Sequence, residues 1–271
     1  MADDSNDDPV EPFDHKAEFT LTIPPSPRWR PPEKQDLPKP FSKDEETVFK
    51  SSDLAPGEMY RFLIGAVVPR PIALISSCSK GPDGTPSNMA PFSYYNLVCH
   101  DPPTIMVSDF ESLEIQMNSS LFQVSINYSR GKPKDTLANI EETGEFVVNS
   151  FNEHFVESGN HCAIPVPYDV EEDQLSGLTL VSSQFVRPKR CLESLISFEC
   201  KFTHCHRIKN SEGVITTGVV FGEIVGVTVK DQVWDPVSKV VDMALYKPVS
   251  RLGGNIYGRT VSGYEIKRPQ V

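Results

Sequence analysis

The chain has 271 residues, and 37 acidic against 26 basic side chains give it a formal net charge of −11. An acidic chain without a basic block is a poor partner for nucleic acid or for an anionic membrane surface. Its length allows one large domain or two small ones with a substantial buried core.

The compartment signals in the sequence favour the cytoplasm. The first residues are acidic, whereas a signal or transit peptide is basic, and no apolar run approaches the roughly 20 residues that span a bilayer. Six cysteines without regular spacing favour reduced thiols over a disulfide framework. We therefore expect a cytoplasmic protein with no membrane partner.

Residues 1–46 differ from the rest of the chain. They carry 12 acidic and 6 basic residues, and they hold 9 of the 24 prolines. Too few apolar residues are present to support a fold, so we expect a disordered acidic, proline-rich tail. An interaction arm is the alternative interpretation.

The regular elements are predicted from residue 56 onward. Helical spacing of apolar residues predicts a short helix over 56–66, and a second helix is expected over 135–142, with Gly144 as its stop. Strand patterns dominate elsewhere, at 72–77, 90–96, 104–108, 146–150, 195–204 and 217–229. Many strands with few isolated helices predict a mainly β chain, a barrel or a sandwich.

The strand expected over 217–229 contains three glycines, at positions 218, 222 and 226. Glycine inside a strand indicates a bulge, a tight barrel bend or the close approach of another backbone segment.

Residues 69–96 hold the densest set of small polar side chains. Ser76 and Ser77 end an apolar strand, a Gly-Pro-Asp-Gly turn follows, and the next strand carries Asn88 and Ser93. Short polar side chains and free backbone N–H groups suit an anionic, hydrogen-bond-rich ligand such as a phosphorylated cofactor. A half-buried hairpin with a polar tip is the simpler alternative.

The order of motifs resembles the flavin reductase-like family of FMN-binding split barrels. The resemblance covers roughly residues 60–260, and its motifs are Arg-Pro-Ile-Ala-Leu-Ile-Ser-Ser at 70–77, Asn-Met-Ala-Pro-Phe-Ser-Tyr-Tyr-Asn at 88–96, Asp-Pro-Pro at 101–103, Lys-Asp-Thr at 134–136, Thr-Gly-Glu-Phe at 143–146, Glu-Cys at 199–200 and Arg-Leu-Gly-Gly at 251–254. It implies a split β-barrel of the Greek-key type over 47–265, with a few peripheral helices, bound FMN and a homodimer.

The resemblance also implies a set of cofactor-binding residues. One wall of the flavin site would come from the first two strands, and the phosphate would be held by a lysine and short polar residues before and within the second helix. Asp135 would be the N-cap of that helix. The implied residues are Ser76, Ser77, Asn88, Ala90, Pro91, Phe92, Ser93, Ser125, Asn127, Lys134, Thr136 and Arg251.

Residues 107–123 interrupt the resemblance, since the family pattern runs almost directly from the strand after residue 103 to Lys134. Val-Ser stands at both ends of the extra material, at 107–108 and 124–125. Codons GTA-AGT, the usual start of an intron, encode Val-Ser, and a terminal CAG encodes Gln. Removing 107–123 deletes 17 residues, or 51 nucleotides, in frame. We expect an inserted hairpin or a retained intron.

The sequence signals for metal-ligating and catalytic side chains are weaker than those for a cofactor site. The run Cys200-Lys201-Phe202-Thr203-His204-Cys205-His206 lacks a second cluster at zinc-site spacing, so we predict no metal site and leave the catalytic residues unassigned. No Walker loop, dinucleotide fingerprint or Gly-x-Ser-x-Gly elbow is present. The reactive chemistry would then come from a cofactor.

The function that follows from the resemblance is an FMN-dependent oxidoreductase that takes electrons from NAD(P)H and passes them to a small-molecule substrate. Nicotinamide would stack directly on the flavin, beside Tyr94 or Tyr95, because no separate nicotinamide-binding domain is evident. Two alternatives stay open. One is an FMN-binding electron-transfer protein without NAD(P)H turnover, and the other is a degenerate, non-catalytic barrel.

Overall fold

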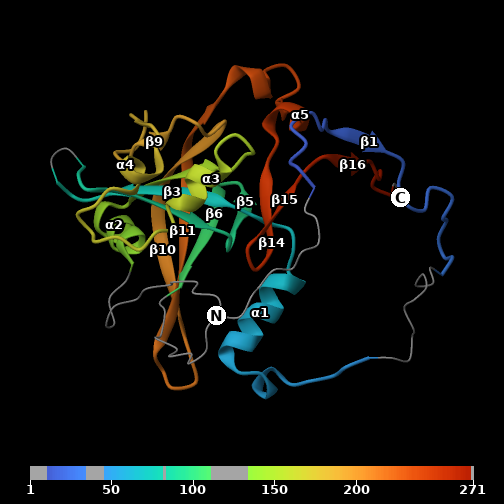
Figure 1. The fold of residues 1–271 in the computed structure, drawn as a ribbon, viewed down its shortest axis with the longest axis horizontal. Helices are drawn as coiled ribbons and strands as arrows, with labels where there is room; N and C mark the ends of the chain where they lie inside the picture. Colours follow the sequence, from blue (N-terminus) through green and yellow to red (C-terminus); the bar gives the residue numbers. More distant parts are fainter. Residues whose placement is uncertain (1–10, 35–45, 82–83, 111–133, 270–271) are drawn as a thin grey trace.

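The computed structural model describes residues 11–34, 46–81, 84–110 and 134–269. A seven-stranded antiparallel sheet forms its centre, with α2, α3 and α4 on one flank and α1, β14 and β15 on the other (Figure 1). The strand order is β4-β3-β7-β10-β11-β6-β5. These strands are β3 Ala73–Cys78, β4 Ser87–Phe92, β5 Tyr95–His100, β6 Pro103–Phe110, β7 Glu145–Ser150, β10 Ile196–Lys209 and β11 Ile215–Val229.

The remaining elements are short and peripheral. The α-helices are α1 Pro56–Ala66, α2 Asp135–Thr143, α3 Val156–His161, α4 Glu172–Ser176 and α5 Met243–Tyr246, with 3-10 turns at Ser51–Asp53 and Asp231–Val233. The small sheets pair β1 Thr20–Thr22 with β16 Ser262–Tyr264, β8 Leu180–Val181 with β9 Arg190–Cys191, β12 Trp234–Asp235 with β13 Val240–Val241, and β14 Val249–Gly253 with β2 Arg70–Pro71 and β15 Ile256–Arg259. The mainly β prediction is confirmed.

The expected strand over 90–96 is in fact two strands. Phe92 pairs with Ala73 at one edge of the sheet, whereas Tyr95 pairs with Val107 at the other edge. Only Ser93 and Tyr94 join these two edges, so the sheet has to curl until the edges lie close together at this link, while β4 and β5 remain the two ends of the hydrogen-bonded strand order. This short link is what makes the sheet a barrel.

Strand β3 is buried on both faces, which explains its continuous apolar run. Ala73 and Ile75 belong to the cluster inside the barrel, with Phe146 and Val148 of β7. Leu74 points the other way, into a second cluster with Phe151 and residues of the loops and helices that cover the sheet. One strand therefore holds both cores together.

The glycines of β11 mark close approaches, but the groups that approach Gly222 and Gly226 are side chains and not the backbone that the sequence pattern indicates. A Cβ added at Gly222 would lie 2.4 Å from Cζ of Phe146, a ring with no exposed surface. A Cβ at Gly226 would lie 2.2 Å from Cδ2 of Phe185. Both positions need glycine because an aromatic ring occupies the space of a side chain.

Part of the expected disordered tail has regular structure. Thr20–Thr22 pair in parallel with Ser262–Tyr264, and the Phe13 ring centroid lies 4.1 Å from the Arg259 guanidinium carbon. Residues 1–10 and 35–45 lie outside the described residues. Within the part of the chain that the structure describes, no helix is long and apolar enough to cross a bilayer.

Strand β6 contains the first residues of the expected insertion. Val107 pairs with Val220 of β11 and with Tyr95 of β5, and the pairing with β11 continues to Phe110 opposite Thr217. The rest of the insertion, from 111 to 123, lies outside the described residues, as do Ser125 and Asn127.

Candidate functional site

A buried polar network joins β3, β4 and α2 at the predicted cofactor residues. The Asn88 Oδ1 atom accepts hydrogen bonds from the Thr136 hydroxyl at 2.7 Å and from the Ser77 hydroxyl at 3.3 Å. All three side chains are at most 8% exposed. The structure therefore places these three predicted residues side by side, and the hydroxyl protons of Ser77 and Thr136 are both donated to Asn88.

Two carboxylates of α4 and its N-cap bind the outer edge of β4. Glu172 accepts from the Asn88 side-chain amide at 2.9 Å and from the Met89 backbone N–H at 3.0 Å. Glu171 accepts from the Ser87 backbone N–H at 2.8 Å and from its hydroxyl at 3.0 Å. Glu172 thereby orients the Asn88 amide, so that its oxygen faces Ser77 and Thr136.

The two carboxyl groups differ in their pKa values, although they are neighbours. Burial is the largest effect on Glu172 and raises its pKa above the ordinary value, against the opposing effect of the Met89 N–H. The hydrogen bond from the Ser87 backbone is the largest effect on Glu171 and lowers its pKa. The buried carboxyl group next to Asn88 is thus the less acidic of the pair.

The network continues outward through α2. The Asn139 side-chain amide donates to the Ser77 hydroxyl oxygen at 3.3 Å, and the Tyr168 hydroxyl donates to Asn139 Oδ1 at 2.7 Å. Asn139 is 1% exposed. A chain of hydrogen bonds therefore runs from a partly exposed tyrosine to the buried Glu172.

Strand alternation decides which backbone donors of β4 are available. Ser87 and Met89 direct their N–H groups outward to the two glutamates, so Asn88, Ala90 and Phe92 direct theirs to β3. Pro91 occupies the next outward-facing position of the strand, and because proline has no N–H group, no unpaired donor is left there. Ser93 lies beyond the last residue of β4, so this alternation does not extend to it.

The start of α2 brings a positive charge to an aromatic ring. The Lys134 ammonium lies 5.8 Å from the Phe92 ring centroid, and the Lys134 carbonyl accepts the first helical hydrogen bond from Ala138 at 2.9 Å. Lys134 is thus the N-cap, and the expectation that Asp135 would fill this position is wrong. Lys134 has the extended backbone of an N-cap, whereas Asp135 is already the first helical residue. Burial raises the pKa of Asp135.

Arg70 lies beside the turn between β4 and β5, and its partner in the pairing of β2 with β14 is Arg251. Arg70 donates through Nη1 to the carbonyls of Ile64 and Val67 at the end of α1, and its Nε lies 3.5 Å from the Ser93 hydroxyl. Arg251 is opposite Arg70 in the pairing of β14 with β2, and it stacks on Tyr257 at 4.5 Å. The structure therefore places Arg251 in strand β14.

Ser76 does not join the network of Ser77. Its hydroxyl donates to the Lys189 carbonyl at 2.6 Å and accepts from the Asn149 amide at 3.1 Å, on the opposite face of β3. Ser125 and Asn127, the other predicted phosphate residues, lie outside the described residues.

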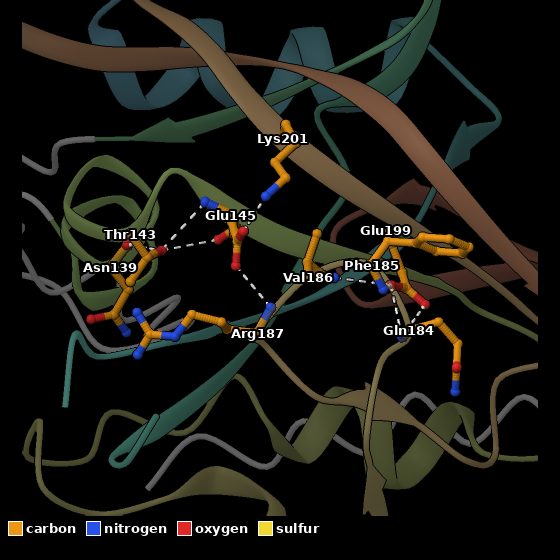
Figure 2. A network of polar contacts seen from close by, with 9 residues as sticks. All are labelled: Asn139, Thr143, Glu145, Gln184, Phe185, Val186, Arg187, Glu199 and Lys201. Atoms are coloured by element: carbon orange, nitrogen blue, oxygen red, sulfur yellow. Dashed lines mark hydrogen bonds and ion pairs between the residues drawn. The ribbon is translucent and has the colours of Figure 1, made fainter. Parts of the chain in front are cut away.

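A second polar cluster fixes the loop at 184–187 against the barrel (Figure 2). The Glu199 carboxylate has no exposed surface and accepts from the backbone N–H groups of Gln184, Phe185 and Val186 at 2.6 to 3.2 Å. Glu145 accepts from the Arg187 backbone N–H at 2.8 Å and pairs with Lys201. The Arg187 guanidinium in turn donates to the Ser79 and Gly81 carbonyls, which secures the turn between β3 and β4.

These contacts fit a phosphorylated, ring-bearing cofactor. The first turn of a nine-residue helix, a lysine and an aromatic ring meet at the end of β4, beside a rigid polar network. Within the described residues, no cluster of His, Cys, Asp and Glu is arranged to hold a metal ion. The fold is thus a β-barrel, and these residues make the end of β4 the candidate position for an anionic, ring-bearing ligand.

The chain belongs to the family described as the flavin reductase like domain, whose model matches residues 64–246. It is 36% identical over 214 residues to an uncharacterized protein of Halalkalibacterium halodurans, covering 79% of this chain and 92% of that protein. A Bacillus subtilis protein, also uncharacterized, is 32% identical over 222 residues, and the match covers 82% of this chain and 98% of that protein. The family predicted from the motifs is confirmed.

Solved structures agree with this assignment. Nitrilotriacetate monooxygenase component B from Bacillus cereus has a TM-score of 0.69 and 25% identity, covering 84% of this chain and 100% of its own. The 2-nitrobenzoate 2-nitroreductase of Pseudomonas fluorescens has a TM-score of 0.66 and 29% identity, and the match covers 82% of this chain and 96% of that chain. A split-barrel protein from Shewanella frigidimarina shows the same fold, with a TM-score of 0.63 and 18% identity. The match covers 83% of this chain and 100% of that chain. The split barrel is confirmed, and a flavin-related redox function is supported.

Sequence reasoning missed four residues of the network: Glu171, Glu172, Asn139 and Tyr168. The two glutamates lie 83 or 84 positions from the β4 groups they bind, in a segment without a motif. Asn139 falls within the resemblance, in the helix after Lys-Asp-Thr, and its polar side chain on the inward side of that helix was the available signal.

Proposed function

We propose that this protein is an FMN-dependent oxidoreductase that accepts electrons from NAD(P)H and passes them to a small molecule. The observation that carries the proposal is the meeting of Lys134, the first turn of α2 and the Phe92 ring, next to the Asn88 network. Bound flavin would supply the redox chemistry, which the side chains of the described residues do not offer.

The residues of this chain bind and position. Lys134 and the N–H groups at the start of α2 bind the phosphate, because a helix N-terminus and an ammonium both attract an anion. Glu172 orients the Asn88 amide, and Asn88 in turn holds the Thr136 and Ser77 side chains in place by accepting their hydrogen bonds. We assign Ala90, Pro91, Phe92 and Ser93 to the flavin edge, Arg251 to its outer side, and Ser125 and Asn127 to the phosphate.

We further propose that the protein acts in the cytoplasm as a homodimer. The outer face of α1 and the β5 edge expose apolar side chains, among them Phe62 at 49% and Leu97 at 60%. Exposed apolar patches of this kind are typical of interaction surfaces. Sedimentation as a monomer at micromolar concentration would exclude the dimer.

The test is an absorbance spectrum of the purified protein, recorded before and after anaerobic addition of NADH or NADPH. We expect a yellow protein that bleaches with one or both nucleotides. Bleaching with dithionite alone would make it an electron-transfer protein. A colourless protein that takes up no added FMN would contradict the proposal and favour a non-catalytic barrel.

A further inference from the structure

A cavity of about 320 Å³ lies at one end of the barrel, away from the turn between β3 and β4. It is lined by Ser150 at the end of β7, Tyr95 at the start of β5, Ile196 at the start of β10 and Tyr246 at the end of α5, and it is partly open to solvent. Ser150 pairs with Ala73, whereas Ser77 lies four residues further along β3. At 3.3 Å per residue this separates the cavity from the Asn88 network by about 13 Å.

The cavity is apolar apart from hydroxyl groups. Its walls include Phe151, Ile196 and Phe198, and none of its ten lining residues carries a charged side chain. Its polar side chains are those of Tyr95, Tyr246 and Ser150. Such a lining suits an uncharged ligand with a small number of hydrogen-bonding atoms.

The two tyrosines face the same space and remain protonated. Burial is the largest effect on each and raises the pKa of both phenols, and the Tyr95 pKa is raised further by Tyr246. The Tyr246 hydroxyl also interacts with Ser150. At neutral pH the cavity therefore offers O–H donors and no phenolate charge.

Size narrows the ligand class. An apolar cavity of about 150 Å³ holds one benzene molecule, so a cavity of twice that volume accommodates two fused rings. We propose that this cavity is a binding site for a small, uncharged bicyclic aromatic molecule that carries a carbonyl-type oxygen acceptor. The cavity is distinct from the proposed phosphate position, because no residue of the Lys134 and Asn88 region lines it. Tyr95 follows the proposed flavin edge at Ser93 by two residues, so the test includes competition with FMN.

The probe is 1-tetralone, a fused two-ring ketone, and its matched control is tetralin, which lacks the oxygen. Calorimetric titration of the full-length protein should show binding of the ketone that weakens about two- to tenfold in Tyr246→Phe. Tetralin affinity should stay the same in that variant. Tyr264→Phe, which changes a tyrosine outside the cavity, should bind both compounds as the parent protein does.

A second variant, Ile196→Phe, fills the cavity and should abolish binding of both compounds, with circular dichroism used to verify the fold. Retained binding in a folded Ile196→Phe protein would overturn the proposal. So would displacement of the ketone by FMN, since this would assign the cavity to the flavin. A protein that binds the ketone but takes up no FMN would refute the proposed function alone.

Discussion

At the scale of single residues, the Lys134 ammonium is the charge most directly tied to the candidate phosphate position. Replacing Lys134 with Ala should weaken FMN binding about tenfold to hundredfold, since a charge-assisted hydrogen bond contributes about 1.5–3 kcal/mol. Riboflavin, which has no phosphate, should lose little. Fluorescence titration with both flavins measures the difference.

Lys239 provides a matched control for this variant. Its ammonium lies 5.9 Å from the Trp234 ring centroid, a geometry similar to that of Lys134 over Phe92. Lys239→Ala should leave both flavin affinities unchanged. Equal weakening of FMN and riboflavin in Lys134→Ala would remove this lysine from the phosphate site.

Glu171 and Glu172 should give opposite pH signatures. Both have the ordinary value of 4.5 when unfolded. The folded pKa of Glu172 is raised, so the folded state binds more protons, and its stability contribution falls as pH rises from 4.5 through that raised pKa. The folded pKa of Glu171 is lowered, so its contribution is present above 4.5 and is lost as pH falls through that lowered pKa.

The measurement is the melting temperature of Glu172→Gln and Glu171→Gln against the parent protein from pH 3 to 7. The deficit of Glu172→Gln should shrink as pH rises above 4.5, because the variant no longer buries a charge. The deficit of Glu171→Gln should instead grow as pH rises toward 4.5. Parallel curves for the two variants would show that burial does not distinguish them.

At the scale of elements, two glycines in different elements should respond oppositely to alanine. Gly222→Ala in β11 places a methyl against the buried Phe146 ring and should destabilise by about 1–3 kcal/mol. Gly65→Ala in α1 meets nothing within 4 Å and should stabilise by about 0.5–1 kcal/mol. Urea unfolding measures the free energy of unfolding of both variants. If Gly222→Ala leaves it unchanged, the Phe146 ring moves aside to accommodate the added methyl group.

Strand β6 gives the insertion hypothesis a sharp test. Removing residues 107–123 would place Val124 and Ser125 at the positions of Val107 and Ser108, with the same residue types and the same inward valine. We expect higher melting temperature and higher flavin occupancy in this variant. Sequencing of the transcript is an independent check, because a dominant message that keeps the 51 nucleotides would exclude a retained intron.

A deletion one residue shorter is the control. Removing 107–122 puts Gln123 at the buried position of Val107 and shifts every later residue to the other face of the strand. This variant should unfold or lose flavin. If the longer deletion behaves equally badly, the segment is a genuine structural element.

The sequence predicted those elements that local signals define. The α2 helix ends one residue before the left-handed Gly144, as its periodicity and stop signal require. The break at Ser93 and Tyr94 was missed because strand-forming residues continue through it, and only closure of the barrel separates the two edges. Asn88 and Thr136 could be predicted because they belong to sequence motifs. Glu172 could not be predicted, because the residues that it binds are distant in sequence.

At the scale of the whole molecule, the N-terminal segment should be nearly dispensable for stability. The β1 strand has three exposed residues, and Phe13 adds a cation–π contact with Arg259 worth about 0.5–1 kcal/mol. Removing residues 1–46 should therefore lower the melting temperature by about 2–4 °C and leave flavin uptake intact. Phe13→Ala alone should reproduce most of this shift, and a much larger drop on deletion would give the segment a structural role.

The occupied edge of β4 also limits how copies of this protein can join. A strand from a second molecule needs unpaired main-chain donors along the edge that it extends. Here the outward N–H groups of Ser87 and Met89 are held by carboxylates, and Pro91 has none to give. Fibrous growth by strand addition is thus blocked at this edge, and any assembly that uses it has to form through side-chain surfaces instead.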